Sequence, residues 1–387
     1  MNIVFISPHF PPNFSNFCSR LVEEGATVLG IGDAPYEELS PELRQAVTEY
    51  YRSDMQCYDD LLRACGWFTH RHGKIDRVVS HNEFWLETEA RLRRDFNIIG
   101  HTPEEVAEFT LKSRMKERFR EAGVAVAAGR VVTDLDEALA LVAVTGYPVV
   151  AKPNRGVGAA ATFKLNSQRQ LEEFITNKPD IPYIMEGFVD GVLNSFDGLV
   201  DRDGKIVFCA SHVFSQGIME TVTENQDLFY YSQRLLPPDL EEAGRATVQA
   251  FGLRETFFHL EFFRTIPDGR IVGLEVNIRP PGGLTLDMFN YANDIDLYRQ
   301  WATMLVGGSS AVEYSRPYHC AYAGRKRGKS YRRSHDEILH HLGRLIIHHE
   351  QISSVFSAAI GDYGYLLRSP ALEELKDAAR YIQELQG

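Results

Sequence analysis

The clearest pattern of apolar and polar positions lies near residues 257–279, where two segments each alternate with a period of two. This period predicts two β-strands, each with one apolar face and one polar face. The Pro267-Asp268-Gly269 segment between them is typical of a hairpin turn. The predicted polar faces carry His259, Glu261, Phe263, Glu275, Asn277 and Arg279. The predicted apolar faces carry Phe258, Leu260, Phe262, Val272, Leu274, Val276 and Ile278.

A three-residue turn, with Gly269 in the left-handed conformation, would place Glu261 directly opposite Glu275. Like charges that face each other across paired strands destabilise a sheet unless a positive group lies between them. A hard divalent cation satisfies this condition, and Mg²⁺ usually also binds substrate phosphates. The hairpin therefore predicts a magnesium site beside a nucleotide. The alternative is a surface hairpin whose acidic side chains are solvated and neutralised by Arg279.

The rest of the chain predicts a mixed α/β (α+β) protein with several domains, because 387 residues exceed what one hydrophobic core usually serves. Residues 1–102 alternate apolar strands with helices, but no G-x-G-x-x-G motif follows the first strand, so a dinucleotide-binding domain is not supported. Thr102-Pro103-Glu104-Glu105 has the pattern of a capped helix start. Short strands and helices between residues 124 and 189 predict a small α/β lid, and strands beyond residue 191 predict an antiparallel sheet.

A glycine-containing loop follows the predicted strand that ends at Lys152. Gly156 and Gly158 would allow backbone amides to approach phosphate oxygens, and Lys152 would supply a compact positive charge. A plain turn is the alternative for a glycine loop taken alone.

Composition narrows the function classes. A formal net charge of -12 disfavours nonspecific nucleic-acid or acidic-membrane binding. No stretch approaches the length of a membrane span and residues 1–6 lack the features of a signal sequence, so we expect a cytoplasmic enzyme without a membrane partner.

Five cysteines without metal-type spacing predict free thiols. The basic run at 325–333 fits a solvated loop or a loop that reaches toward an anionic ligand. The oligomeric state stays open, a homodimer included.

Taken together, these motifs resemble the ATP-grasp superfamily, in which a Glu and then Glu-x-Asn-x-Arg close the nucleotide site. The Arg-Pro-Pro-Gly-Gly continuation is most similar to the carboxylate-amine (amino-acid) ligase branch. The resemblance implies an ATP-grasp fold with an N-terminal α/β pre-domain at 1–102, a linker helix and small mobile lid at 103–190, and a large antiparallel-sheet domain at 191–387.

The resemblance also implies a role for each matching residue. Glu261, Glu275 and Asn277 would hold Mg²⁺, for which Mn²⁺ could substitute. Arg279 would face the phosphoryl group or the reacting carboxylate, and it is implied as catalytic together with Lys152. The implied nucleotide-binding residues are Lys112, Lys152, Gly156, Gly158, Glu186, Gly187 and Phe188.

The implied activity is an ATP-dependent ligation of a small carboxylate, such as an amino acid, to an amine. The carboxylate is phosphorylated to an acyl phosphate, the amine displaces phosphate, and ADP and phosphate are released. Two alternatives stay open: a biotin carboxylase or carbamoyl-phosphate type of enzyme that activates bicarbonate, and a non-catalytic ATP-binding regulator. His212 and His259 fit either substrate binding or buried, hydrogen-bonded structural positions.

Overall fold

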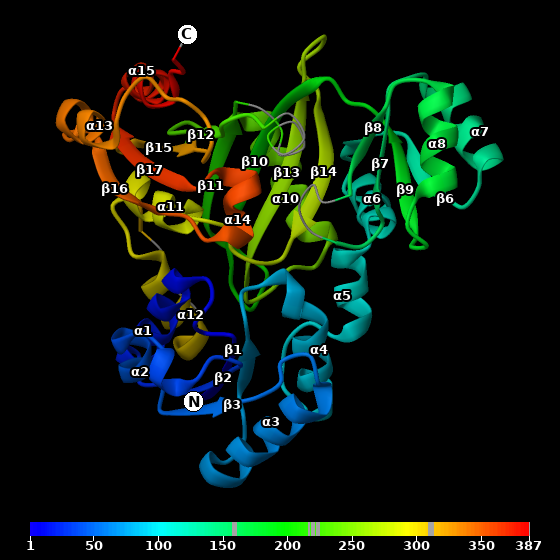
Figure 1. Ribbon diagram of the computed structural model, residues 1–387. Coiled ribbons are helices and arrows are strands. Elements are labelled where there is room, and N and C mark those ends of the chain that lie inside the picture. The colour runs from blue at the N-terminus through cyan, green and yellow to red at the C-terminus, as the bar shows by residue number, and fades with distance from the viewer. Residues whose placement is uncertain (157–160, 216, 218–220, 222–224, 309–312, 387) are drawn as a thin grey trace.

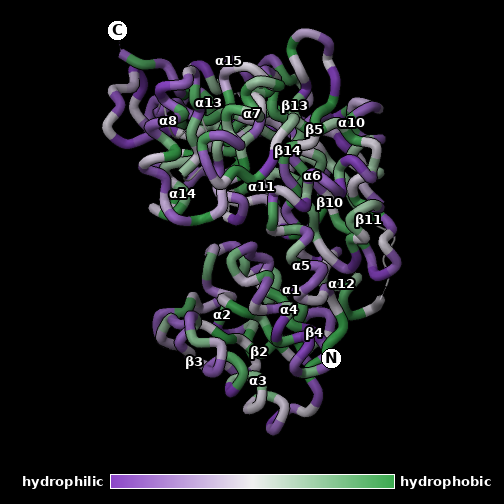
Figure 2. Tube along the Cα trace, turned by 90° about the vertical axis from the view of Figure 1, so that its right-hand side faces the viewer, coloured by the Kyte–Doolittle hydropathy of each residue, from purple (hydrophilic) through white to green (hydrophobic). Residues whose placement is uncertain are grey.

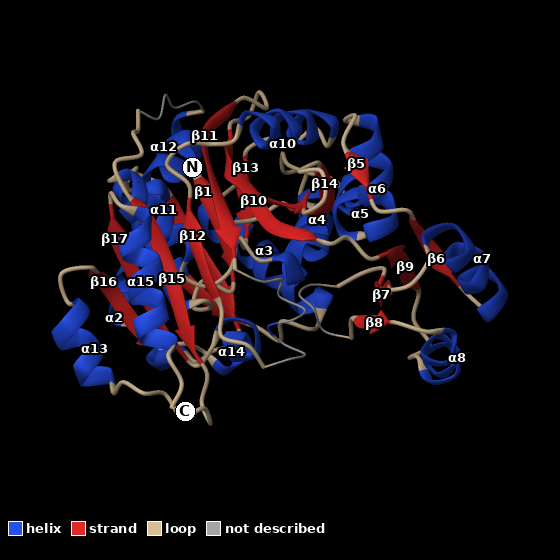
Figure 3. Cartoon of the chain, turned by 90° about the horizontal axis from the view of Figure 1, so that it is seen from above, coloured by secondary structure: helices blue, strands red, loops and turns tan. Residues whose placement is uncertain are grey.

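The computed structural model describes the chain except for residues 157–160, 216, 218–220, 222–224, 309–312 and 387. Three β-sheets and their helices make up the described part (Figure 1). Seen from above, the strands of the largest sheet run side by side, and the small sheet of β6–β9 lies apart at one end (Figure 3). This mixed architecture agrees with the predicted fold class.

The N-terminal domain is a parallel sheet with strand order β3-β2-β1-β4. Its strands are β1 Asn2–Ile6, β2 Thr27–Gly32, β3 Glu49–Arg52 and β4 Arg77–Val79. Its helices are α1 Ser15–Glu23, α2 Pro41–Ala46, α3 Tyr58–His72 and α4 Leu86–Asp95. Apolar stretches occur in the interior of both lobes of the molecule, and hydrophilic stretches follow the outer loops (Figure 2).

Two consecutive helices, α5 Pro103–Thr110 and α6 Lys112–Glu121, connect this domain to the rest of the chain. The predicted cap at Thr102 is present as a complete capping box, in which Thr102 and Glu105 exchange hydrogen bonds. Helix α6 packs closely on β14 (Ile271–Asn277), because a Cβ atom on Gly273 would lie only 2.7 Å from the Phe119 ring. Glycine at this position therefore allows α6 to lie against the large sheet.

The small sheet is antiparallel with strand order β6-β9-β7-β8, and it forms the lid with two helices. Its elements are β6 Gly129–Val132, α7 Leu135–Thr145, β7 Val149–Pro153, β8 Phe163–Leu165, α8 Gln168–Asn177 and β9 Tyr183–Gly187. The buried residues of its hydrophobic cluster all come from the lid, between Val132 and Met185. The lid therefore has a core of its own.

The large sheet has strand order β16-β17-β15-β12-β11-β10-β13-β14-β5. Its other strands are β5 Ala125–Val126, β10 Gly191–Val200, β11 Ile206–Phe214, β12 Phe229–Ser232, β13 Thr256–Thr265, β15 His319–Arg325, β16 Ile346–Gln351 and β17 Tyr363–Ser369. One face packs on α10 Pro238–Ala250, α13 His335–Leu342 and α15 Leu372–Gln383. The other face packs on α11 Thr285–Asn293 and α14 Ser354–Ile360. This second face also carries the polar residues of the predicted hairpin.

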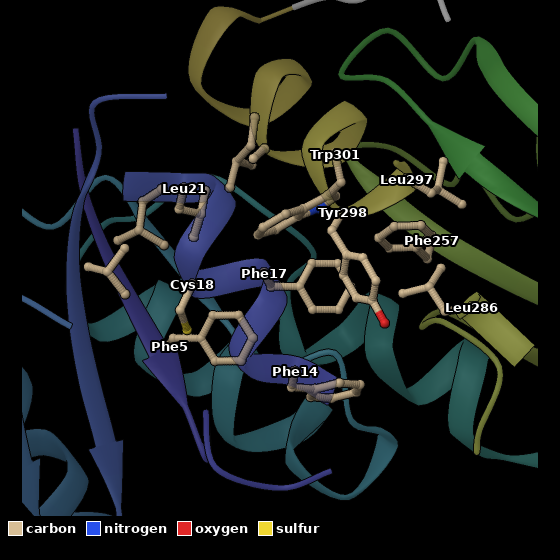
Figure 4. Close-up of a cluster of buried hydrophobic side chains, with 14 of the residues drawn as sticks. Phe5, Phe14, Phe17, Cys18, Leu21, Phe257, Leu286, Leu297, Tyr298 and Trp301 are labelled. Carbon is tan, nitrogen blue, oxygen red and sulfur yellow. The ribbon is translucent and has the colours of Figure 1, made fainter. Parts of the chain in front are cut away.

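A single hydrophobic cluster joins the N-terminal domain to the large sheet (Figure 4). Helix α12 Leu297–Gly307 inserts Trp301 at this junction, and the ring centroids of Phe17 and Trp301 are 5.1 Å apart. Phe17 also contacts Phe257 of β13, at 5.8 Å between centroids. These contacts fix the N-terminal domain beside the strands that carry the acidic residues. In the described part of the chain, none of the helices combines the length and apolar character needed to cross a bilayer.

Candidate active site

The acidic hairpin forms the centre of the site, and its register agrees with the prediction, because Glu261 pairs directly with Glu275. The predicted three-residue turn is wrong. Thr265 N donates to Arg270 O at 3.0 Å, so the loop comprises residues 266–269, an even number, with Gly269 at φ +69°. An even loop alone would pair Glu261 with Leu274. A β-bulge beyond Glu261 shifts the register by one residue and restores the pairing of the two carboxylates.

The predicted orientation of Leu274 is wrong, because the bulge turns its side chain to the other face of the sheet. Alternation placed Leu274 on the apolar face with Val276, but Leu274 packs in the cluster of Phe263 and Leu193, and Val276 packs in the cluster on the opposite face. Leu274, Phe263 and Leu193 all line the cavity beside the two glutamates. The bulge therefore supplies an apolar wall next to the acidic pair.

Two cationic groups partly neutralise the acidic pair. Lys112 Nζ lies 3.3 Å from Glu275 Oε1, and His259 Nε2 lies 3.1 Å from Glu261 Oε1. Asn277 follows on the same strand, and its Oδ1 accepts a hydrogen bond from Arg279 Nη2 at 3.4 Å.

The donor set fits a metal that shares its coordination with phosphate. Glu275 Oε1 is buried and accepts no hydrogen bond. Within the described ranges, no group of three or more His, Cys, Asp or Glu side chains is arranged to hold a metal alone. Glu261, Glu275 and Asn277 supply only oxygen ligands, and Mg²⁺ commonly binds one or two carboxylates and fills its remaining positions with water and phosphate.

Two lysines contact the buried carboxylate of Glu186 at the edge of the lid. Lys152 Nζ and Lys116 Nζ lie 3.2 and 3.1 Å from the Glu186 carboxylate. Burial opposes ionisation of Glu186, but the two lysines hold its pKa below the usual value. Burial lowers the pKa of Lys116, although Glu186 acts in the opposite direction. Sequence reasoning missed Lys116. Its spacing of four residues from Lys112 on α6 is the signal that places both on one helix face.

The glycine loop lies directly beside Lys112. Lys112 Nζ donates to Gly156 O at 2.6 Å, and Lys112 N donates to Asn154 O at 2.8 Å. Gly156 has φ +133°, a conformation that strongly favours glycine. The predicted phosphate contact at Gly158 lies outside the described residues. The described part of the loop thus places backbone groups next to a buried lysine.

Residues 186–188, implied by the resemblance to bind the nucleotide, lie at the end of β9 and are called the hinge below. Gly187 and Phe188 line the cavity together with Glu186. Phe188 N donates to Pro148 O at 3.1 Å, and Lys164 Nζ lies 3.8 Å from the centre of the Phe188 ring. The hinge backbone therefore borders the same cavity as the acidic hairpin.

Arg279 connects the site to the N-terminal domain. Its Nη2 lies 3.2 Å from Glu83 Oε2, and its Nη1 donates to Pro280 O at 2.9 Å. Burial raises the pKa of Glu83, and the Arg279 charge opposes this shift. Asn82, by contrast, serves as a cap, since its Oδ1 accepts from Phe84 N.

Solved structures share the fold that carries this site. No family model matches the chain. An L-amino acid ligase from Bacillus licheniformis superposes with a TM-score of 0.77 at 15% identity, over 98% of this chain and 96% of that one. The chain has the ATP-grasp fold. A biotin carboxylase domain of 2-oxoglutarate carboxylase from Hydrogenobacter thermophilus, solved with MgADP and bicarbonate, gives a TM-score of 0.67 at 16% identity, over 100% of this chain and 90% of that one.

Sequence similarity is weaker and covers part of the chain. An L-arginine-specific L-amino acid ligase from Bacillus subtilis is 27% identical over 235 residues, which are 58% of this chain. The match spans 56% of that relative, about half of its length. The predicted resemblance to ATP-grasp ligases is thus confirmed for the fold.

A buried polar network lies behind the acidic hairpin of this ATP-grasp fold. Asp197 Oδ1 is 2.5 Å from His259 Nδ1, and Asp197 Oδ2 is 3.0 Å from His212 Nδ1. Burial opposes both ionised forms, but their mutual attraction lowers the pKa of Asp197 to about 2 and raises that of His259 to about 9. His259 thereby joins Asp197 to Glu261 and holds that glutamate in place. Sequence reasoning did not single out Asp197, because its position in a buried strand has no local signal.

A cavity of about 650 Å³ lies beside the acidic hairpin. The lid, the hinge, the acidic hairpin and α14 form its walls. The predicted site residues that line it are Lys112, Lys152, Glu186, Gly187, Phe188, Glu261, Glu275, Asn277 and Arg279. Gly156 contacts Lys112 beside it. The ATP-grasp fold thus brings together, around one space, the described residues that the sequence motifs indicate.

Proposed function

We propose that the protein is an ATP-dependent carboxylate-amine ligase that forms an amide bond through an acyl phosphate. One observation carries this proposal: the paired Glu261 and Glu275, the amide of Asn277 and the guanidinium of Arg279 share a cavity with two buried lysines. The adjoining lid and hinge supply the loop and apolar wall that a nucleotide needs.

We assign the nucleotide to the space between the hinge and the acidic hairpin. Glu186, Gly187 and Phe188 would contact the base and sugar, and Lys112 and Lys152 would neutralise phosphate charge. Gly156 and Gly158 would bring backbone amides to the phosphates. Glu261, Glu275 and Asn277 would hold Mg²⁺, or Mn²⁺ in its place. When bound, the metal neutralises charge on the phosphates and stabilises their transfer.

The reaction then has two steps. A carboxylate oxygen of the acid forms a bond to the γ-phosphorus, and the bond from that phosphorus to ADP breaks. The amine nitrogen next attacks the acyl carbon, phosphate leaves, and the nitrogen loses a proton. Arg279, with five N–H donors, would stabilise negative charge on the transferring phosphoryl group and on the tetrahedral oxyanion.

The lid would close over the reactants, because water hydrolyses an acyl phosphate. We place the functional units at residues 1–102, 103–190 and 191–387. In the structure β5 nevertheless pairs with β14 and α12 packs on α1, so short segments cross between these units.

Hydroxylamine is the amine that best tests this function, because it traps an acyl phosphate as a hydroxamate. The protein would be incubated with ATP, Mg²⁺, hydroxylamine and a panel of carboxylic acids. Hydroxamate formation together with ADP release supports ligation. Phosphate release that depends on bicarbonate alone would support bicarbonate activation instead, and nucleotide binding without ADP release would support a regulator.

Glu275→Gln tests the metal assignment within the same assay. Loss of one metal-binding charge is expected to lower turnover by about 100-fold or more, since metal stabilisation of the transition state is worth several kcal/mol. Glu117→Gln is the matched control, because Glu117 on α6 is 57% exposed. Undiminished ADP release by Glu275→Gln would contradict the assignment.

A further inference from the structure

The cavity has two ends with different linings. At one end are the hinge and Leu274, next to the acidic pair. At the other end are Phe214 of β11, Leu228, Tyr230 of β12, and Phe356 and Ile360 of α14. The proposed nucleotide site uses only the first end.

The strand order separates the two ends. Four steps lie between β14 and β12 in the order β14-β13-β10-β11-β12. The walls of the two ends therefore come from different strands, and Leu193 and Phe263 connect the two ends within one apolar cluster. Phe214 pairs directly with Tyr230, so both side chains lie on the sheet face that carries the acidic pair. The second end is therefore an apolar compartment on the same face, continuous with the acidic pair.

The second compartment is apolar. None of the five side chains named at this end is charged, and the Tyr230 hydroxyl already lies 2.8 Å from Thr285 Oγ1. Helix α14 has no buried residue, although Phe356 and Ile360 both face the cavity. Phe356 is held from outside by a parallel stack on Phe10 of the N-terminal domain, with centroids 5.7 Å apart. A polar or charged group placed against these described side chains would lose its hydration without gaining a partner from them.

The loop that follows Arg279 leads directly into this compartment. Pro281, Gly282 and Gly283 all line the cavity. Gly283 has φ +63°, and a Cβ atom there would lie 2.9 Å from Ile360 Cδ1. The absence of a side chain at Gly283 keeps the passage between the guanidinium and α14 open.

From this arrangement we infer that the apolar compartment receives the bulky apolar side chain of the carboxylic acid substrate, while Arg279 faces its carboxylate. The substrate class is thus an acid with a branched aliphatic or aromatic side chain, an apolar α-amino acid included. The inference rests on the proposed ligase function and adds the class of carboxylic acid for which the ligase would be specific.

The test compares acids in the hydroxamate assay with ATP, Mg²⁺ and the whole 387-residue chain. Leucine and phenylalanine are expected to give a kcat/KM at least about tenfold above those of glycine, aspartate and lysine, the range typical of an apolar pocket. A preference for glycine, aspartate or lysine would overturn the inference while leaving ligation intact. Hydroxamate formation with none of the acids would overturn both.

Variants of α14 test whether this helix sets the preference among acids. Ile360→Ala is expected to raise the KM for the preferred acid about tenfold and to leave the KM for ATP unchanged. Phe356→Leu, which keeps the wall apolar, should shift the preference toward larger side chains. Ile99→Ala is the matched control, because Ile99 is 71% exposed and lies outside the cavity. An equal change in the KM for ATP, or no change in acid preference in either α14 variant, would contradict the assignment of this compartment.

Discussion

The N-terminal domain and the lid both border the active site, but they are joined to the large sheet in different ways. The N-terminal domain shares a continuous hydrophobic cluster with β13 and α12, centred on Phe17, Phe257 and Trp301. The lid keeps its hydrophobic cluster to itself, and polar contacts such as the ion pair between Lys116 of α6 and Glu186 join its inner edge to the neighbouring helix. Among the described residues, buried apolar surface joins the N-terminal domain to the large sheet but does not join the lid to it.

This difference has a physical consequence for function. Separating the N-terminal domain would expose the shared cluster to water, at a cost of roughly 25 cal/mol for each Å² of apolar surface. Moving the lid exposes none of its own cluster. The N-terminal domain therefore holds Glu83 firmly beside Arg279, and in the proposed function the lid is the part that would open for nucleotide entry.

The largest loss of stability is expected from truncating a side chain in the hydrophobic cluster that the N-terminal domain shares with the large sheet. Trp301→Ala should lower the free energy of unfolding by about 3–5 kcal/mol, because it removes a fully buried indole that contacts both regions. Denaturant unfolding followed by circular dichroism would measure the loss. Trp67→Ala is the control, since Trp67 is 44% exposed. A loss below about 1 kcal/mol in Trp301→Ala would mean that the two regions do not share a core.

A lid variant of comparable chemistry should act locally. Leu171 of α8 is fully buried in the lid cluster, so Leu171→Ala should cost about 2–4 kcal/mol of lid stability. Hydrogen exchange is expected to accelerate in residues 129–187 and to stay unchanged in α1 and α12. Faster exchange throughout the protein would show that lid and large sheet unfold as one unit.

The sequence predicted most of the lid and little of the C-terminal part, and the reason lies in the local patterns. Strand β6 and helix α7 lie within residues 124–189, where the sequence predicted short strands and helices. Strands β16 and β17 and helix α14 had no such signal: His348 and His349 interrupt β16, and the seven residues of α14 are too few for a helical period. Contacts distant in sequence define these elements.

The candidate site likewise contains some residues that a local motif predicts and others whose positions depend on contacts distant in sequence. The motif Glu-x-Asn-x-Arg is local, so it indicated Glu275, Asn277 and Arg279 directly. The bulge at Leu274 and the buried position of Asp197 depend on packing across strands, which alternation cannot reveal. The basic run 325–333 was likewise expected to be solvated or to reach an anion, but Lys326 is buried and its Nζ donates to Thr221 O at 2.6 Å.

Lowering the pH should reduce stability at the junction of the N-terminal domain through a buried histidine that has no counterpart in the lid. His81 lies at the junction between Phe17 and Trp301, and burial followed by the Arg93 charge lowers its pKa to about 3. Below pH 6.5 the unfolded chain binds a proton that the folded state does not, so stability should fall as the pH decreases from 6.5 toward 3. The slope would be at most about 1.4 kcal/mol per pH unit from this group. Residues 129–187 contain no histidine, so the lid lacks this contribution.

His81→Phe provides the measurement. Phenylalanine keeps an aromatic ring against Phe17 and Trp301 but removes the titrating group. Unfolding free energies of both proteins, measured between pH 7 and 4, are expected to diverge as the pH falls, with the variant losing less. Parallel curves would assign the acid sensitivity to other groups. The comparison uses slopes, so any constant cost of the substitution at the positive φ of residue 81 cancels.

The smallest effect should come from the one contact described here that joins the glycine loop of the lid to the N-terminal domain. Arg155 Nη1 lies 2.7 Å from Glu87 Oε2, and both side chains are more than half exposed. An exposed ion pair contributes at most about 1 kcal/mol, so Arg155→Ala and Glu87→Gln should each change the KM for ATP by no more than about fivefold. A double-mutant cycle at low salt would measure their coupling, and 0.5 M NaCl should remove it. A coupling well above 1 kcal/mol would show that the lid is held to the N-terminal domain more firmly than its separate core implies.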